Sequence, residues 1–313
     1  MKKSWNVSKY LMITVDPLHI GVGGQRLGRV DATVVRDPIS NVPKIPGTSI
    51  SGALKFFFDL ALRNNGKNNI CSSTRGSDKS NDHNRSECPV CAAFGYTTDK
   101  LSMQGILQFS DGNLLAYPIN TIAGPVWITT AGRLCDLCGL GDGMEKSPEE
   151  YIPVVPDSTV FKEKNVVRPT LNFGWIIMES SKESAPVSKA ELEKLNIPAR
   201  YVDRMVIVPE YVFSNLVNSN MEVRTSVVID PETGAAKGGG LFTYEAVVKG
   251  ALFIFELTEN DYAAIWSKVK HDKKGASATE MLETNAFPGV EAVGIGGMTT
   301  RGFGRLHIEK MGE

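Results

Sequence analysis

The sequence predicts an α+β protein built around an antiparallel sheet. Short apolar runs with the character of strands recur along the 313 residues, and turn-rich segments separate them. Only a few stretches have the pattern and the end signals of a helix. No segment repeats at a fixed period. Because 42% of the residues are hydrophobic and 22% are charged, the chain can bury a core, and we treat residues 1–313 as one domain.

The N-terminal part begins with a strand and a glycine-rich loop. Tyr10 to Asp16 is a buried-strand run, and the loop from His19 to Gly28 follows it. Val30 to Arg36 is expected to form a second strand, followed by a turn-rich loop from Asp37 to Gly47. Thr48 or Ser49 can cap a helix that reaches about Arg63, since Asn64-Asn65-Gly66 is a stop signal.

Two segments in the first half are expected to be irregular. Residues 66–87 are mostly Asn, Ser, Lys, Asp and Gly, so this stretch has no core of its own. Arg133 to Glu150 is the second irregular stretch. Strand patterns lie between them, at Gly105 to Ser110 and near Val126 to Thr130.

The second half predicts strands around two short helices. Ser188 to Glu191 is a capping box that opens one helix, and Asp261 to Lys270 is the other. A hairpin is expected from Arg224 to Asp230 and from Leu241 to Val248, around Pro231-Glu232-Thr233-Gly234. Further strands are expected at Met205 to Val208, Leu252 to Leu257 and Leu306 to Glu309. This order of strand, helix, strands, helix and strand favours a ferredoxin-like unit with long insertions.

Charge and hydropathy limit the classes of function. No apolar run approaches the roughly 18 to 20 residues of a membrane span, and the run from Tyr10 to Val15 is too short for a signal peptide. We therefore expect a cytoplasmic protein that does not bind membranes. The net charge is −1, yet residues 1–55 hold eight Lys or Arg and three acids. That basic region suits a phosphate backbone, and it also fits an uneven solvated surface.

Four of the five cysteines occur as two Cys-x-x-Cys pairs. Cys71, His83, Cys88 and Cys91 can together close a tetrahedral Zn²⁺ site, which would order a polar segment that cannot fold unaided. Incidental thiols near the core are the simpler interpretation. Cys135 and Cys138 form the second pair, which could supply ligands or act as a redox pair.

The last candidates for functional residues are a glycine cluster near the C-terminus and three ionisable residues. The cluster from Gly294 to Arg305 precedes a strand, so it is not a dinucleotide loop, but with Arg301 it could let a phosphate backbone approach closely. A tightly packed loop is the alternative. His19, Asp31 and Glu245 are candidates for proton transfer or metal binding, although each alone is weak support.

Several segments together resemble the RAMP proteins, which form the repeated backbone of CRISPR effector complexes. They are Asp16-Pro-Leu-His-Ile-Gly21, Leu27-Gly-Arg-Val-Asp31, Pro43-Lys-Ile-Pro-Gly-Thr-Ser-Ile-Ser-Gly-Ala-Leu-Lys55, the stretch from Gly105 to Pro118, the hairpin and the final glycine loop. The chain is most similar to the type III-B (Cmr) backbone subunit, and the Cys-Pro-Val-Cys pair is similar to type III-A (Csm) subunits.

The resemblance implies a fold shaped like a right hand. A ferredoxin-like (RRM-like) palm would hold a fingers insertion with zinc at 66–100 and a thumb hairpin at 224–245. Copies of the chain would stack as a helical filament on guide RNA, with other type III effector subunits, and cut the paired target RNA at regular intervals.

The resemblance also implies roles for individual residues. Asp31 would be catalytic, with His19 and Glu245, and cleavage by the 2′-hydroxyl would need Mg²⁺ or Mn²⁺. The residues expected to contact RNA are Arg29, Arg36, Lys44, Ser49, Lys55, Phe242, Tyr244, Gly296, Gly297 and Arg301.

Three functions thus remain open. The first is an endoribonuclease subunit. The second is a catalytically silent RNA-binding filament subunit, in which Asp31 only holds a loop. The third is a redox protein that uses Cys135 and Cys138, although no βαβ unit surrounds that pair.

Overall fold

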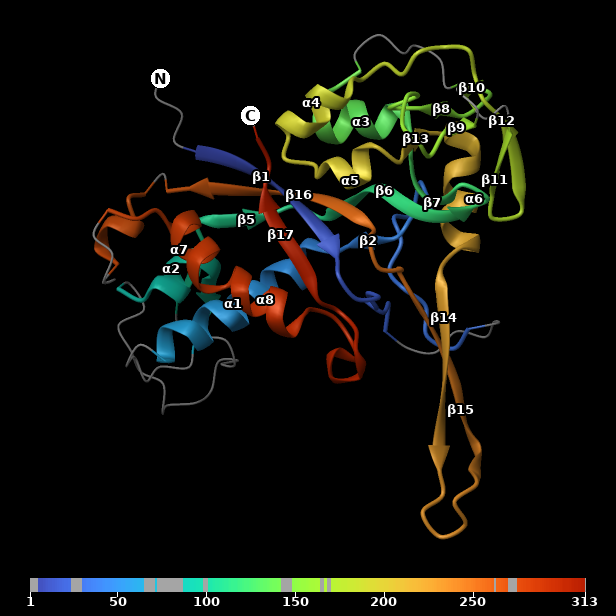
Figure 1. The fold of residues 1–313 in the computed structure, drawn as a ribbon. Helices are drawn as coiled ribbons and strands as arrows, with labels where there is room; N and C mark the ends of the chain where they lie inside the picture. Colours follow the sequence, from blue (N-terminus) through green and yellow to red (C-terminus); the bar gives the residue numbers. More distant parts are fainter. Residues whose placement is uncertain are drawn as a thin grey trace.

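A central sheet with helices on both faces and one long hairpin that projects from the body make up the molecule (Figure 1). The structure is a computed structural model. It describes residues 5–23, 30–64, 71, 87–97, 101–141, 148–163, 166–167, 170–261, 263–269 and 275–312. None of the helices in these ranges is long and apolar enough to cross a membrane.

Nine strands of the described chain form the central sheet. Its path runs β17–β1–β16–β6–β7–β13–β8, while β2 pairs with β6 and β5 pairs with β16. Neighbours are antiparallel except β7 and β13. The strands are β1 Trp5–Thr14, β2 Lys44–Ile45, β5 Leu107–Phe109, β6 Gly112–Thr121, β7 Gly124–Thr129, β8 Ile152–Pro153, β13 Met205–Ile207, β16 Leu252–Asn260 and β17 Leu306–Lys310.

The other strands form four two-stranded sheets. They are β3 Gly95–Thr97 with β4 Ser102–Gln104, β9 Lys162–Glu163 with β10 Val166–Val167, β11 Thr170–Phe173 with β12 Ile176–Glu179, and β14 Glu222–Ile229 with β15 Ala236–Ala246.

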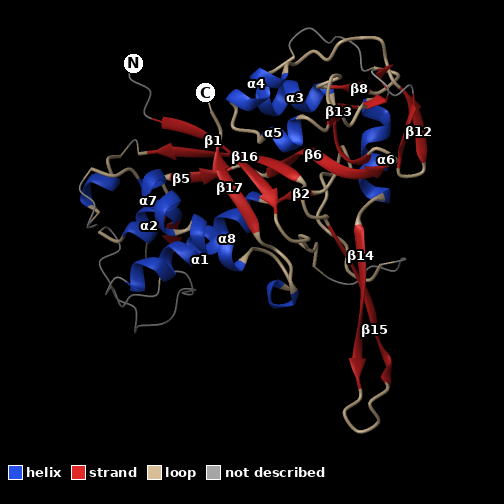
Figure 2. Ribbon diagram, viewed as in Figure 1, coloured by secondary structure: helices blue, strands red, loops and turns tan. Residues whose placement is uncertain are grey.

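Helices cover both faces of the sheet (Figure 2). The α-helices are α1 Gly47–Asn64, α2 Pro89–Phe94, α3 Ala131–Cys138, α4 Lys189–Lys194, α5 Ala199–Val202, α6 Glu210–Ser219, α7 Ala278–Asn285 and α8 Phe287–Val293. Two 3-10 helices are η2 Trp266–Lys268 and η3 Thr299–Arg301.

Alternation along β1 explains why both faces are buried. Tyr10 and Met12 join the core cluster that packs under α1, α7 and α8, whereas Leu11 and Ile13 join the cluster that packs under α3, α4 and α5. Successive strand residues point to opposite faces, so a run with no polar position predicts a strand that is covered on both sides.

The hairpin of β14 and β15 leaves the body as a two-stranded ribbon (Figure 1). Its register joins Glu222 with Ala246 at the base and Ile229 with Ala236 near the tip, with an irregularity between Val227 and Ile229. Its exposed aliphatic side chains are Val223, Val227, Val228, Ile229 and Leu241. These five exposed side chains therefore do not contribute to the core of this chain.

Much of the predicted architecture is confirmed. The α+β class with an antiparallel sheet is present, as are the strands at both ends and the hairpin, which begins two residues earlier than expected. Ser188 caps α4 with the reciprocal hydrogen bonds of a capping box.

Several local predictions were wrong. Val30 to Arg36 is no strand, because its residues form single bridges to different partners as the segment crosses the hairpin base. Asp261 to Lys270 gives only η2 among its described residues, since the Asp261 carboxylate accepts from Ile265 N and Trp266 N and closes a single turn. The supposedly irregular stretch after Arg133 contains most of α3. The helix predicted after Thr48 or Ser49 begins earlier, at Gly47.

Candidate functional site

Asp31 lies against the base of the projecting hairpin. Its Oδ2 atom accepts hydrogen bonds from Thr243 N at 2.7 Å and from Thr243 Oγ1 at 3.1 Å. Its own backbone N–H donates to Thr243 Oγ1 at 3.2 Å. The hydrogen bonds from Thr243, backbone first, hold the pKa of Asp31 below its ordinary value. A partly exposed, ionised carboxylate is therefore fixed where the hairpin joins the body.

His19 and the final glycine loop pack together beside β15. His19 is buried, and its Nδ1–H donates to the carbonyl oxygen of Glu245 at 2.5 Å. Gly297 N donates to His19 O at 2.9 Å. Gly296 has a φ of +82°, and a Cβ there would lie 2.6 Å from His19 O. The loop thus requires glycine because it packs closely on the backbone of His19.

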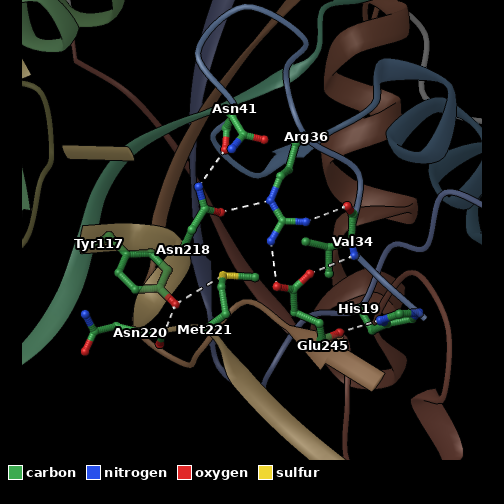
Figure 3. A network of polar contacts seen from close by, with 9 residues as sticks. All are labelled: His19, Val34, Arg36, Asn41, Tyr117, Asn218, Asn220, Met221 and Glu245. Carbon is green, nitrogen blue, oxygen red and sulfur yellow. Dashed lines mark hydrogen bonds and ion pairs between the residues drawn. The ribbon is translucent and has the colours of Figure 1, made fainter. Parts of the chain in front are cut away.

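Glu245 is the centre of a polar network at the hairpin base (Figure 3). Its Oε1 accepts from Arg36 Nη2 at 2.6 Å, and its Oε2 accepts from Val34 N at 3.2 Å. Arg36 Nε also donates to Asn218 Oδ1 at 2.9 Å, and Asn218 Nδ2 donates to Asn41 O at 2.9 Å. The Arg36 and Glu245 side chains are only 20% and 10% exposed. Both residues therefore tie the loop after Asp31 to β15 and α6.

Aromatic residues of β15 pack at the hairpin base rather than at its tip. Tyr244 is 6% exposed, with its ring centroid 5.5 Å from that of Phe303. The guanidinium of Arg224 lies over the ring of Phe303, with its Cζ 4.5 Å from the ring centroid. Phe242 is partly exposed and lies 6.1 Å from Tyr244. Of these two aromatic residues, both expected to contact RNA, only Phe242 is partly exposed in this structure.

Lys44, expected to contact RNA, already has a carboxylate partner. Its Nζ donates to Asp111 Oδ2 at 2.6 Å, and Asp111 Oδ1 accepts from Gly47 N at 2.8 Å. This hydrogen bond to Asp111 raises the pKa of Lys44. The same carboxylate therefore neutralises Lys44 and stabilises the start of α1.

The remaining RNA candidates that the structure describes lie on two elements. Ser49 and Lys55 lie half-buried on α1, and Arg301 is exposed on η3. Arg29 lies outside the described residues.

Three of the four expected metal ligands lie together. The Sγ atoms of Cys71, Cys88 and Cys91 all lie within 4.8 Å of one another, and those of Cys71 and Cys88 are 3.4 Å apart. Asp59, buried on α1, accepts from Cys71 N at 3.3 Å. Such a trio of thiols can hold a metal ion. His83, the fourth predicted ligand, lies outside the described residues.

The second cysteine pair lies apart from this trio. Cys135 and Cys138 belong to α3, and Cys138 packs against the core cluster on the other face of the sheet. Burial raises the pKa of Cys138 to about 12. Because the thiolate is the nucleophile in thiol exchange, this environment does not favour redox chemistry.

Two partners in the site were not anticipated from the sequence. Thr243 holds the Asp31 carboxylate, and Asn218 on α6 holds the Arg36 guanidinium. Both contacts join residues about 200 positions apart in the chain, so no local pattern could have found them. The only available signal was that Thr243 lies two residues before Glu245.

The sequence of this chain is similar to those of known proteins. The chain matches the RAMP superfamily over residues 12–307. It is 24% identical to the CRISPR system Cmr endoribonuclease Cmr4 of Pyrococcus furiosus over 256 residues, which span 77% of this chain and 78% of the relative. A shorter match of 90 residues is 30% identical to the Csm3 endoribonuclease of Methanothermobacter thermautotrophicus, and it covers 28% of this chain and 32% of that protein.

Solved structures share the fold over nearly the whole chain. A chain of the type III-B Cmr-beta complex bound to cognate target RNA gives a TM-score of 0.67 at 14% identity, covering 97% of both chains. Oligomeric Cmr4 from Pyrococcus furiosus gives a TM-score of 0.55 at 16% identity, with coverage of 97% of this chain and 98% of that one. Since the superfamily match extends over nearly the entire sequence, the chain belongs to the RAMP superfamily.

Proposed function

We propose that this chain is the guide-RNA-binding backbone subunit of a type III-B CRISPR effector complex. In the assembled complex it cuts the paired target RNA at regular intervals, next to further copies of itself and other effector subunits. The observation that carries this proposal is the ionised Asp31 carboxylate at the base of the projecting hairpin. The similarity to the Cmr4 endoribonuclease over 77% of the chain supports it.

The palm of this subunit is ferredoxin-like. The antiparallel order β17–β1–β16–β6 supports this assignment, since α1 lies between β1 and β6 in sequence and α7 and α8 lie between β16 and β17. The hairpin of β14 and β15 is the thumb. The segment 66–100 with its cysteines is the fingers insertion.

The chemistry at Asp31 is attack by the RNA's own 2′-hydroxyl, which gives up its proton to water. Its oxygen forms a bond to the adjacent phosphorus, the bond from phosphorus to the 5′-oxygen breaks, and the 5′-oxygen takes up a proton from water. The products are a 2′,3′-cyclic phosphate and a 5′-hydroxyl. The ordinary pKa of an aspartate is about 4, and that of Asp31 is lower still, so it is a poor base. Its role is to position the hydroxyl or to hold a cation.

Mg²⁺ or Mn²⁺ fits the oxygen chemistry of Asp31. Oδ2 is occupied by Thr243, and among the residues that the structure describes no other side chain or backbone N–H donates to Oδ1. Hard divalent cations prefer carboxylate oxygens and RNA phosphates as ligands. When bound, the cation would stabilise charge that develops on the phosphate.

His19 and Glu245 belong to the same site as positioning residues. The His19 imidazole holds the Glu245 carbonyl, and the Glu245 carboxylate holds Arg36. For RNA contacts we favour Lys55, Arg301 and the backbone of Gly296 and Gly297, with Phe242 stacking on a base. Ser49 and Lys44 can approach phosphates at the start of α1, and Lys44 and Arg36 would first have to exchange their carboxylate partners. Arg29 stays a candidate from the sequence.

Zinc is the metal we propose for Cys71, Cys88 and Cys91. A tetrahedral site with Zn–S bonds of about 2.3 Å separates its sulfurs by about 3.8 Å, which suits the observed cluster. The role of this zinc is structural, because its ligands would hold residue 71 at the start of α2, and Cys71 N also donates to Asp59 of α1. His83 would complete the ligand set.

The competing function is a catalytically silent filament subunit. The hydrogen bonds between Asp31 and Thr243 are the observation that favours this second function. They would be present equally if the aspartate served only to anchor its loop to β15. The two functions differ in the cutting of a complementary target.

The deciding experiment compares complexes reassembled with wild-type, Asp31→Ala or Asp37→Ala subunits. Asp37 is the matched control, because its carboxylate caps its own exposed turn through Ser40 N and Ile39 N. We expect Asp31→Ala to slow cutting by at least about 100-fold, with guide RNA binding and assembly unchanged. The Asp37 variant should cut like wild type. Equal cutting by the Asp31 variant would leave the filament function in its place.

A further inference from the structure

Thr243 turns its backbone away from the other arm of the hairpin. It stands opposite Thr225 of β14 in the ladder, yet its N–H donates to Asp31 Oδ2 and its carbonyl accepts from Ala32 N at 3.1 Å. In an antiparallel ladder such a residue is the non-hydrogen-bonded kind, so its polar groups face the open edge. Residues 31 and 32 occupy that edge.

The Asp31 carboxylate therefore substitutes for a backbone acceptor at the edge of β15. The Thr243 hydroxyl closes the arrangement, since it accepts from Asp31 N and donates to Asp31 Oδ2. Three hydrogen bonds to one residue fix both the backbone and the side chain of Asp31. They use one carboxylate oxygen and leave Oδ1 for an RNA or cation ligand.

We propose that Thr243 is a positioning residue for target RNA cleavage, whose hydroxyl and backbone N–H orient the Asp31 carboxylate. This inference rests on the proposed function of Asp31. Because Thr243 belongs to β15, the orientation of the cutting carboxylate is set by the same strand that forms the projecting hairpin. A misplacement of about 1 Å at such a group can cost about 100-fold in rate, so one hydroxyl can matter.

The test uses Thr243→Val, which removes the hydroxyl at nearly constant shape, and Thr243→Ser, which restores it. Thr225→Val is the matched control, because that threonine is exposed on the opposite strand at the same level of the ladder. In reassembled complexes we expect Thr243→Val to slow single-turnover cutting by about 10-fold or more, with target affinity changed less than about 2-fold. Thr243→Ser and Thr225→Val should cut at close to the wild-type rate.

A double variant and a measurement of hydrogen exchange test the same contact independently of the single variants. The double variant Asp31→Ala, Thr243→Val should cut no more slowly than Asp31→Ala alone, because Thr243 acts only through the Asp31 carboxylate. Hydrogen exchange at the Thr243 amide of the full chain, measured without RNA, should accelerate in Asp31→Ala, since that substitution removes the acceptor.

The outcomes separate this inference from the proposed function. Wild-type cutting by Thr243→Val, beside an inactive Asp31→Ala, would overturn the positioning role and leave Asp31 as the catalytic group. Unchanged exchange of the Thr243 amide in Asp31→Ala would overturn the contact itself. Full cutting by Asp31→Ala would remove both.

Discussion

At the scale of single residues, the ion pair between Arg36 and Glu245 links three parts of the chain. Glu245 lies on β15, Arg36 lies in the loop after Asp31, and Arg36 also binds Asn218 of α6. Both charges are mostly buried. A buried charge that loses its partner costs more than an exposed one, because it keeps the desolvation penalty without compensation.

We therefore expect Glu245→Gln to lower the free energy of unfolding by about 2 to 3 kcal/mol. Glu222→Gln is the matched control at the base of the same hairpin. Its pair with Arg224 is more exposed, at 28% and 40%, and exposed pairs contribute at most about 1 kcal/mol. Urea unfolding at a constant m-value measures both changes. Equal losses in the two variants would contradict the structural role of Glu245.

The pair between Lys44 and Asp111 predicts a dependence of stability on pH. Partial burial opposes ionisation of Asp111, but the hydrogen bonds from Lys44 and Gly47 outweigh it and hold its pKa below the ordinary value. A carboxyl whose pKa is depressed by folding stabilises the protein above its unfolded pKa, which is about 3.9. That contribution is lost as the pH falls through the folded pKa.

Asp111→Asn should thus flatten the dependence of unfolding free energy on pH below about pH 4 and lower the stability at pH 7. Lys44→Gln should flatten the same part of the curve less, because Gly47 N still donates to Asp111, and the double variant should resemble Asp111→Asn. Denaturant unfolding at a series of pH values provides the measurement. A wild-type slope in Asp111→Asn would exclude this pair as a source of the acid sensitivity.

At the scale of elements, the cysteine trio joins Cys71 to Cys88 and Cys91 at the start of α2, and Cys71 N donates to Asp59 of α1. We expect purified protein to contain about one zinc per chain. Cys88→Ser and Cys91→Ser should lose the metal, whereas Cys135→Ser and Cys138→Ser should retain it, because the second pair lies on α3 against the other core cluster. Elemental analysis after extensive dialysis measures the content. Native protein that is free of zinc, with five freely titratable thiols, would refute the site.

The elements that sequence could predict are those whose signals are local. β1 contains the apolar run from Tyr10 to Ile13, β16 contains the run from Leu252 to Phe255, and Ser188 opens α4 with a capping box. Ser277 opens α7 with a box of the same kind, so that helix could have been predicted. α3 was missed because its cap, Thr130, precedes a polar stretch that suggests a loop.

In the candidate site, too, the residues that could be predicted are those with a local sequence signal. The trio of cysteines followed from spacing, because Cys88 and Cys91 are separated by a single turn at the start of α2. The partners of Asp31 and Lys44 did not, because Thr243 and Asp111 reach them through the tertiary fold. Tyr244 was expected to contact RNA because it lies in the hairpin, and only its packing against Phe303 in the tertiary fold shows that it is buried.

At the scale of the whole molecule, the hairpin of β14 and β15 projects far from the body (Figure 1). Replacing residues 231–240 by Asn-Gly would keep the ladder as far as the pair of Val227 and Leu241, close it with a short loop and remove the outer part of the ribbon. We expect such a variant to assemble on guide RNA and to change the spacing of cuts in target RNA, because the ribbon would no longer separate successive segments of the duplex. Gel analysis of cut positions measures the spacing.

Glu232→Ala is the control for this change, because it alters an exposed tip residue without altering the length of the hairpin. It should leave the cut positions unchanged. Identical cut positions in the shortened variant would refute the assignment of this hairpin as the thumb.

The position of β1 in the sheet has a consequence for how the chain reaches its native state. Tyr10 pairs with Phe255 on one side and with Lys310 on the other, so the first strand has no sheet partner until the last fifth of the chain is available. Such a high contact order makes folding slow, because the entropy of closing long loops must be lost before native contacts form. During synthesis the apolar run from Tyr10 to Ile13 therefore stays without its sheet partners until β16 and β17 are made, and an unpaired apolar strand is prone to aggregation.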